Sequence, residues 1–467
     1  MTFGKNLIMA FGAQGVGFIA SLVTSFVVPK LLGVSEFGYW QLFMFYTTYV
    51  GFFHFGLNDG VYLLLGGKRR DEVDKKSVNS QFLFGLIYQT VISLSILFIS
   101  LGFISDGGRQ LVWMSTAVFL LLYNVTYFFG SLFQAMNETR LFSLSTVVDR
   151  FTFLILLFVL LLNRVDKFEY YVACFAISKT ASMVYCLYHA RDFLKSGTYP
   201  LSTAAGMSLS SIRVGSKLMF ANIADMLILG ATRFFIDCRW GIEVFGEVSF
   251  SLSMVTFFIS FVSQASMVLF PTLRLRGSEA LSRLYQEMRG AMLVLFPALY
   301  ALYFPMVWLI GNWLPQYEGS LHFFALLLPI CVFNTKMDLS CTTYLKVLRE
   351  EKLLLKLNIA TVLISAALSF VGVYALHSVD IALLGSVGAI IGRACLSERI
   401  IDGKMGVRHT SMMIGEVALT FAFIVIALRL EGGWGLSAYI ACYFAYLICF
   451  KYDTRGVLNN IKARLFN

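Results

Sequence analysis

Four basic residues stand inside long apolar blocks of the sequence, where a charge needs a chemical reason. They are Arg150, Lys179, Arg233 and Lys336. A charged side chain at the centre of a bilayer costs at least about 2.5–3.5 kcal/mol on insertion scales, so it normally faces a partner or a water-filled cavity. Arginine holds phosphate oxygens with two parallel hydrogen bonds, and lysine acts as a point charge. We therefore predict that these four side chains line a cavity that binds an anionic substrate.

Acidic residues in the same kind of block provide an alternative. Asp149, Asp225 and Asp338 could neutralise the four bases across helices, and Arg233 could pair with Asp237 on one helix face. Asp225 has a second interpretation, because a carboxylate deep in an apolar block could take up a proton and couple transport to a proton gradient. From the sequence, that role and a permanent ion pair are equally supported.

The sequence Gly-Leu-Asn-Asp-Gly at 56–60 interrupts an overlong apolar block, 37–65. We expect the helix to bend or break there, because glycine tolerates backbone conformations that other residues avoid. Asn58 and Asp59 would then lie near the cytoplasmic mouth of the cavity and could contact substrate. A helix break favours Asn and Asp in any case, and the nearby His54 is more often a satisfied core histidine.

The overall composition requires elements that lie in a membrane. Of 467 residues, 58% are hydrophobic and 14% are charged, whereas a soluble domain is about half apolar and a quarter charged. The excess apolar residues form long blocks, which excludes a soluble enzyme, and the net charge of +10 lies in short gaps, which excludes a nucleic-acid binder. The sequence has no phosphate-binding G-x-x-x-x-G-K-[ST] motif, no CxxC pair and no visible catalytic set. We therefore predict no enzyme activity, no cofactor and no metal site.

The apolar blocks predict an all-α integral membrane protein of about fourteen transmembrane helices, because a span needs about 20 apolar residues. The spans are 7–29, 37–65, 78–104, 110–134, 141–162, 169–188, 214–236, 244–270, 289–311, 319–344, 353–376, 380–397, 411–428 and 434–450. Most of the 37 Lys and Arg residues are assigned to gaps on one side, Arg289 and Arg393 among them. The positive-inside rule then places both termini in the cytoplasm.

A short motif occurs twice and indicates an internal repeat. G-x-x-x-F-G stands at 33–38 and again at 241–246, six predicted spans later. An even number of spans preserves orientation, so the halves should be parallel repeats around a central cavity. The predicted organisation is an N-lobe at 1–190, a cytoplasmic linker at 191–213, a C-lobe at 214–398, two additional helices at 409–450 and a cytoplasmic tail at 451–467.

Two segments carry a family resemblance. VVPKLLGVSEFGYWQLF (27–43) and FGLNDGVYLLLGGK (55–68) resemble the Wzx-like flippases of O-antigen and capsule repeat units, in the MOP exporter superfamily. The resemblance implies a MATE-like fold and alternating access. It also implies that a polyprenyl-diphosphate-linked oligosaccharide moves from the cytoplasmic to the outer leaflet of a bacterial inner membrane. Membrane lipids and other polysaccharide-assembly membrane proteins are the implied partners.

Two other functions remain open. A cation-coupled multidrug exporter of the same superfamily would share this architecture, but such exporters typically carry an acidic residue in the first span, where this sequence has only Gln14 as a strongly polar interior residue. A membrane polysaccharide polymerase or ligase would need a long outer loop, and the predicted outer gaps are short.

Overall fold

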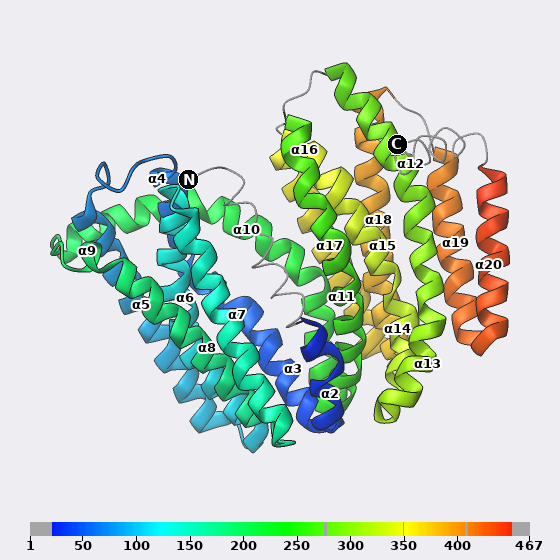
Figure 1. Cartoon of the computed structure of the whole chain (residues 1–467), viewed down its shortest axis with the longest axis horizontal. Coiled ribbons are helices and arrows are strands. Elements are labelled where there is room, and N and C mark those ends of the chain that lie inside the picture. The colour runs from blue at the N-terminus through cyan, green and yellow to red at the C-terminus, as the bar shows by residue number, and fades with distance from the viewer. Residues whose placement is uncertain (1–20, 275–277, 349, 407–409, 451–467) are drawn as a thin grey trace. The chain divides into compact units, whose positions relative to one another are not determined.

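The computed structural model describes residues 21–274, 278–348, 350–406 and 410–450, and every regular element in these ranges is helical (Figure 1). The chain divides into two compact units, Met1–Ile223 and Ala224–Asn467. Helix α10, at Leu201–Trp240, belongs to both units.

The first unit contains helices α2 to α9, a 3-10 segment η1 and the beginning of α10. Their bounds are α2 Val28–Leu31, α3 Val34–Tyr49, η1 Val50–His54, α4 Leu57–Leu65, α5 Lys75–Phe103, α6 Gly107–Ala135, α7 Thr139–Leu162, α8 Phe168–His189 and α9 Arg191–Leu194.

The second unit contains the rest of α10 and all later elements, including two π-helical segments, η4 and η5. The bounds are α11 Ile242–Arg274, α12 Ser278–Ala298, η2 Leu299–Leu302, α13 Tyr303–Trp313, η3 Pro315–Tyr317, α14 Ser320–Leu327, α15 Pro329–Lys336, η4 Met337–Thr342, α16 Thr343–Val347, α17 Glu351–Phe370, η5 Val371–Ala375, α18 Val379–Met405, α19 Thr410–Arg429 and α20 Gly432–Cys449.

The predicted all-helical membrane architecture is confirmed. Among the described residues, eleven helices are long and apolar enough to cross a membrane, or twelve if the two halves of α10 form one span. These correspond to the third to fourteenth predicted spans. The second predicted span is the broken pair α3 and α4, and most of the first lies in residues 1–20, outside the described part of the chain.

The break in the second span is confirmed and has a local cause. Phe55 and Gly56, between η1 and α4, have positive φ angles of 51° and 93°. A Cβ atom on Gly60 would lie 1.9 Å from the backbone oxygen of Ser211, and one on Gly56 would lie 2.4 Å from the backbone nitrogen of Ser216. Glycine is therefore required both by the backbone conformation of the break and by the close crossing of α10.

Helix starts follow from short polar signals in the sequence. Both copies of the repeat motif open a helix, since α3 begins directly after Gly33 and α11 directly after Gly241. The carboxylate of Asp74 accepts a hydrogen bond from the Ser77 amide and caps α5, and Asp106 caps α6 through the Arg109 amide. Such caps satisfy amides that have no partner within the helix.

The predicted linker at 191–213 is partly helical. It contains α9, and α10 begins at Leu201 and continues into the seventh predicted span. Residues 201–213 are less apolar than the span itself but contain no proline, so the hydrophobic block ends there while the helix does not.

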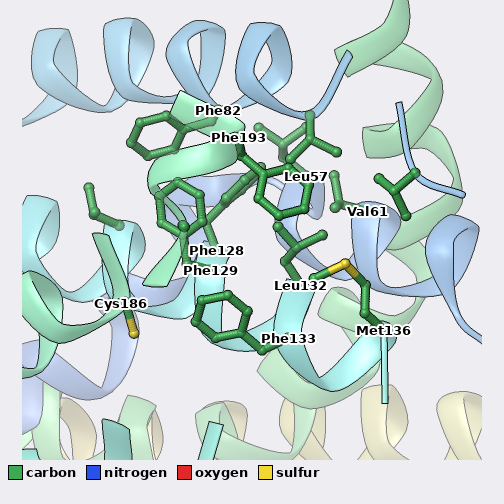
Figure 2. Close-up of a cluster of buried hydrophobic side chains, with 14 residues drawn as sticks. Leu57, Val61, Phe82, Phe128, Phe129, Leu132, Phe133, Met136, Cys186 and Phe193 are labelled. Carbon is green, nitrogen blue, oxygen red and sulfur yellow. The ribbon is translucent and has the colours of Figure 1, made fainter. Parts of the chain in front are cut away.

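An aromatic cluster holds α4 in place after the break. Figure 2 shows Leu57 of α4 among Phe82, Phe128 and Phe129, whose side chains come from α5 and α6. The rings of Phe82 and Phe129 have centroids 4.7 Å apart. Burial of these side chains fixes the first turn of α4 against the two long helices.

Charged side chains tie the loops of the first unit together beside this cluster. Arg70, which follows α4, contacts Glu138 at 3.0 Å and Asp192 at 3.1 Å. Lys75 contacts the second oxygen of Asp192 at 2.8 Å. One ionic cluster therefore joins the loop after α4, the start of α5, the residue before α7 and the short helix α9.

Candidate functional site

Arg150 is an exposed cation in the middle of α7. The buried stripe of this helix runs through Ser145, Phe153 and Leu157, and Arg150 lies at the edge of that stripe with an exposed side chain. The helix is long and apolar enough to cross a membrane. Within the described part of the chain, Arg150 has no ion-pair partner. A cation at this depth needs water or an anion.

Lys179, on α8, is already neutralised. Its ammonium group forms an ion pair with Asp149 of α7, and the hydroxyl of Ser178 donates to the same carboxylate at 3.1 Å. The ammonium also lies 5.7 Å from the centroid of the Tyr123 ring. In the present conformation, Asp149 of the neighbouring helix therefore neutralises Lys179, as the alternative prediction states.

The helix break brings together a compact polar set. Asp59 accepts a hydrogen bond from the hydroxyl of Tyr127 at 3.0 Å, and His54 Nε2 lies 3.8 Å from the other carboxylate oxygen. The amide of Gly56 donates to His54 Nδ1 at 2.8 Å. Asp59 and Asn58, the two residues predicted to lie at a cytoplasmic mouth, are both buried inside the first unit.

A small cavity adjoins the break on the side of Asn58. It has a volume of about 10 Å³, and its polar lining consists of Asn58, Gln89 and Asn124. The side-chain oxygen of Asn124 is buried without a hydrogen-bond partner. The space suits a single water molecule that donates to this oxygen.

Asp225, on α10, is paired with a base that the sequence interpretation misplaced. Arg393 donates to Asp225 and to the side-chain oxygens of Asn358 and Asn334, at 3.2 and 3.0 Å for the two amides. The assignment of Arg393 to a gap was wrong, because the residue lies inside the predicted span 380–397 and its guanidinium is buried in the middle of α18. The side chain of Asp225 is 55% exposed.

Lys336 lies in a buried ionic network. Its ammonium contacts Glu398 at 2.6 Å and also pairs with Glu416, and all three side chains are almost completely buried. Arg289 pairs with Glu398 and contacts Asp402 at 3.0 Å. The network joins α12, α15, α18 and α19. Arg289, like Arg393, was wrongly assigned to a gap, since it is buried within α12.

Arg233 has a different setting again. It donates to the hydroxyl of Ser249 at 2.9 Å, and its guanidinium lies 5.0 Å from the centroid of the Phe245 ring. These contacts hold Arg233 between α10 and α11.

Asp338, the third predicted intramembrane acid, lies on the π-helical segment η4 with an exposed side chain.

The four predicted bases have four different local settings. Arg150 and Lys179 lie on neighbouring helices of the first unit, whereas Arg233 and Lys336 have separate partners in the second. Sequence reasoning missed Glu416 and Glu398. Glu416 stands inside the thirteenth predicted span, so the search for charges in apolar blocks would have found it.

The sequence matches a known protein family, and the fold is similar to those of solved structures. A family model described as polysaccharide biosynthesis protein matches residues 3–274. The fold is similar to that of the lipid II flippase MurJ in an inward closed conformation, with a TM-score of 0.66, 11% identity, and coverage of 96% of this chain and 99% of that chain. It is also similar to an inward-facing multidrug resistance MATE transporter of the MOP superfamily, with a TM-score of 0.63, 12% identity, and coverage of 85% and 98%.

A MOP superfamily transporter from Pyrococcus furiosus is similar at a TM-score of 0.51 and 14% identity, with coverage of 85% of this chain and 94% of that chain. Identities this low show a shared fold alone. No curated protein sequence matches the chain. The family model covers more than half of the residues, so the chain belongs to the polysaccharide biosynthesis protein family, and its fold is similar to that of MOP superfamily transporters.

Proposed function

We propose that the protein is a flippase that moves polyprenyl-diphosphate-linked oligosaccharide units from the cytoplasmic to the outer leaflet of a bacterial inner membrane. The observation that carries this proposal is the polysaccharide biosynthesis family match over 3–274. The similarity in fold to a lipid II flippase supports it. Both termini would be cytoplasmic, and other membrane proteins of polysaccharide assembly would supply and consume the substrate.

Arg150 is our first choice for the residue that contacts the diphosphate. It is exposed at membrane depth and has no ion-pair partner among the described residues, so its charge is available to an anion. Lys179 would contribute only after leaving Asp149, and Arg233 is held by Ser249 and Phe245. The contacts of Lys336 support a structural role, because two buried carboxylates already occupy its ammonium.

A matched pair of variants on α7 tests the proposal. Proteoliposomes would contain a labelled polyprenyl-diphosphate oligosaccharide, and accessibility to a lectin would report its leaflet. Arg150→Ala should slow translocation about tenfold or more, since a hydrogen bond to a charged group contributes about 1.5–3 kcal/mol. Arg140→Ala removes an exposed arginine from the first turn of the same helix and should leave the rate unchanged.

Equal rates for the two variants would exclude Arg150 from the substrate site. Absence of protein-dependent translocation with several lipid-linked sugars would refute the proposal that the protein is a flippase.

The second candidate function is a cation-coupled drug exporter, and one observation favours it. Asp225 and Asp338 both expose carboxylates on the second unit, where a cationic compound could bind. Counterflow of a cationic dye, and its loss in Asp338→Asn, would identify that function.

A further inference from the structure

The carboxylate of Asp59 is buried, and no lysine or arginine among the described residues pairs with it. Only 7% of its side chain is exposed, and its one hydrogen bond among the described residues comes from the neutral hydroxyl of Tyr127. The nearest basic group is His54, and the 3.8 Å between Nε2 and the carboxylate oxygen exceeds hydrogen-bond distance. An ionised carboxylate in such a setting is strongly unfavourable unless a positive charge compensates it.

His54 does not supply that charge in this conformation. Its Nδ1 accepts the amide hydrogen of Gly56 at 2.8 Å, so Nδ1 carries no proton. An imidazolium ion has a hydrogen on both ring nitrogens and could not accept this bond. The left-handed conformation of Phe55 and Gly56 places the amide against the ring. The geometry of the break therefore keeps His54 neutral.

In the part of the chain that the structure describes, the lysines and arginines of the other helices do not pair with Asp59 either. Lys179 of α8 is paired with Asp149 of α7. Arg213 and Lys217 lie on α10, which crosses the break, but both side chains are exposed, and neither forms an ion pair with Asp59 in the described structure.

The remaining titratable groups near the break are tyrosines, which are neutral hydrogen-bond donors at physiological pH. The hydroxyl of Tyr88, on α5, donates to the backbone oxygen of His54 at 2.9 Å. Tyr123 and Tyr127 lie on α6, and Tyr62 lies on α4, one turn after Asp59. Among the described residues, no lysine or arginine of α4, α5, α6, α7, α8 or α10 therefore forms an ion pair with this carboxylate.

We propose that Asp59 is a proton-binding site of the transport cycle, protonated in this conformation and deprotonated when the break moves. On release, the O–H bond of the carboxylic acid breaks and the proton passes to water, leaving a carboxylate. That carboxylate lies in the first turn of α4, where the helix amides and dipole stabilise a negative charge once water enters. The role in energy coupling rests on the proposed function, whereas proton binding does not.

This assignment moves the coupling role away from Asp225. That residue is paired with Arg393 and is more than half exposed, so its charge is compensated in the present conformation. Asp59 is buried and pairs with no lysine or arginine among the described residues. Of these two carboxylates, Asp59 is the one whose environment favours the neutral form.

Infrared difference spectroscopy of the full chain in lipid tests proton binding without any substrate. At neutral pH, the C=O stretch of a protonated carboxylic acid should be present in the wild type and lost in Asp59→Asn. Asp71→Asn removes a carboxylate that is 70% exposed and should not change that band. Asp59→Glu should restore a carboxylic acid band if the asparagine variant folds poorly. A band of equal intensity in the wild type and Asp59→Asn would overturn the proposal.

Transport under a pH gradient tests coupling separately. In proteoliposomes, the gradient should change the wild-type flipping rate, whereas the rate of Asp59→Asn should be the same with and without the gradient. Full retention of the gradient effect in Asp59→Asn would overturn the coupling role. A protein that flips no lipid-linked sugar but shows the infrared band would refute the proposed function and leave the proton-binding site standing.

Discussion

The ionic network around Lys336 makes a quantitative prediction that separates a structural role from substrate binding. Lys336→Met removes the ammonium that contacts Glu398 at 2.6 Å and pairs with Glu416, with all three side chains at most 2% exposed. Removing one partner of a buried ion pair typically costs about 3–5 kcal/mol, because the other charge is left uncompensated. Glu398 keeps Arg289, but Glu416 keeps no described cation, so we expect a loss in this range.

A double variant and an exposed pair serve as controls. Lys336→Met combined with Glu416→Gln leaves no uncompensated charge on α19 and should recover most of the loss, since apolar or neutral replacements of buried pairs are often neutral. Lys404 contacts Glu350 at 2.5 Å with both side chains more than a third exposed. Lys404→Met should therefore cost less than about 1 kcal/mol.

The assay is reversible unfolding of the purified protein in mixed micelles, followed by helical circular dichroism against denaturant. The reasoning is refuted if Lys336→Met is no less stable than Lys404→Met, or if the double variant recovers nothing. A Lys336→Met protein that is stable but no longer flips substrate would instead support the prediction that Lys336 lines the substrate cavity.

Two further predictions concern the first unit. Gly60→Ala should prevent the close crossing of α4 and α10, because the added Cβ would lie 1.9 Å from the Ser211 oxygen, and we expect a large loss of folded protein in size-exclusion chromatography. Burial raises the pKa of Asp192, but the hydrogen bond from Lys75 and the charges of Arg70 and Lys75 outweigh burial and hold this pKa below its usual value. The resulting stabilisation is present above about pH 4, the pKa of an unfolded aspartate, and is lost as pH falls through the lower folded-state value, so Asp192→Asn should flatten the pH dependence of unfolding in this range.

Each of these predictions has an internal control. Gly102 lies in α5 with no atom within 4 Å of an added Cβ, so Gly102→Ala should raise stability slightly, by up to about 1 kcal/mol. A Gly102→Ala protein as poorly folded as Gly60→Ala would count against the crossing argument. Asp71→Asn should leave the acid sensitivity as it is in the wild type, and an unchanged slope in Asp192→Asn would show that the Arg70 cluster does not stabilise the fold.

Much of the fold could be predicted because its causes are local in the sequence. The length of each apolar block sets a helix that can span a bilayer. The helix break at 56–60 follows from glycines that permit positive φ, and the starts of α3 and α11 follow from a repeated short motif. The end of the linker was harder to predict from the sequence, because α10 begins at Leu201, before its sequence becomes strongly apolar.

The partners of the charged residues were decided by the tertiary structure. Lys179 meets Asp149 because α7 and α8 pack together, and Asp225 meets Arg393 although 168 positions separate them. The sequence alone shows that a charge lies in an apolar block and therefore needs compensation. It does not show whether a carboxylate, a tyrosine hydroxyl or water provides it, because that depends on which helix faces come into contact. For this reason the sequence determined the number and kind of spans, while only helix packing distinguished the exposed Arg150 from the neutralised Lys336 and revealed the uncompensated Asp59.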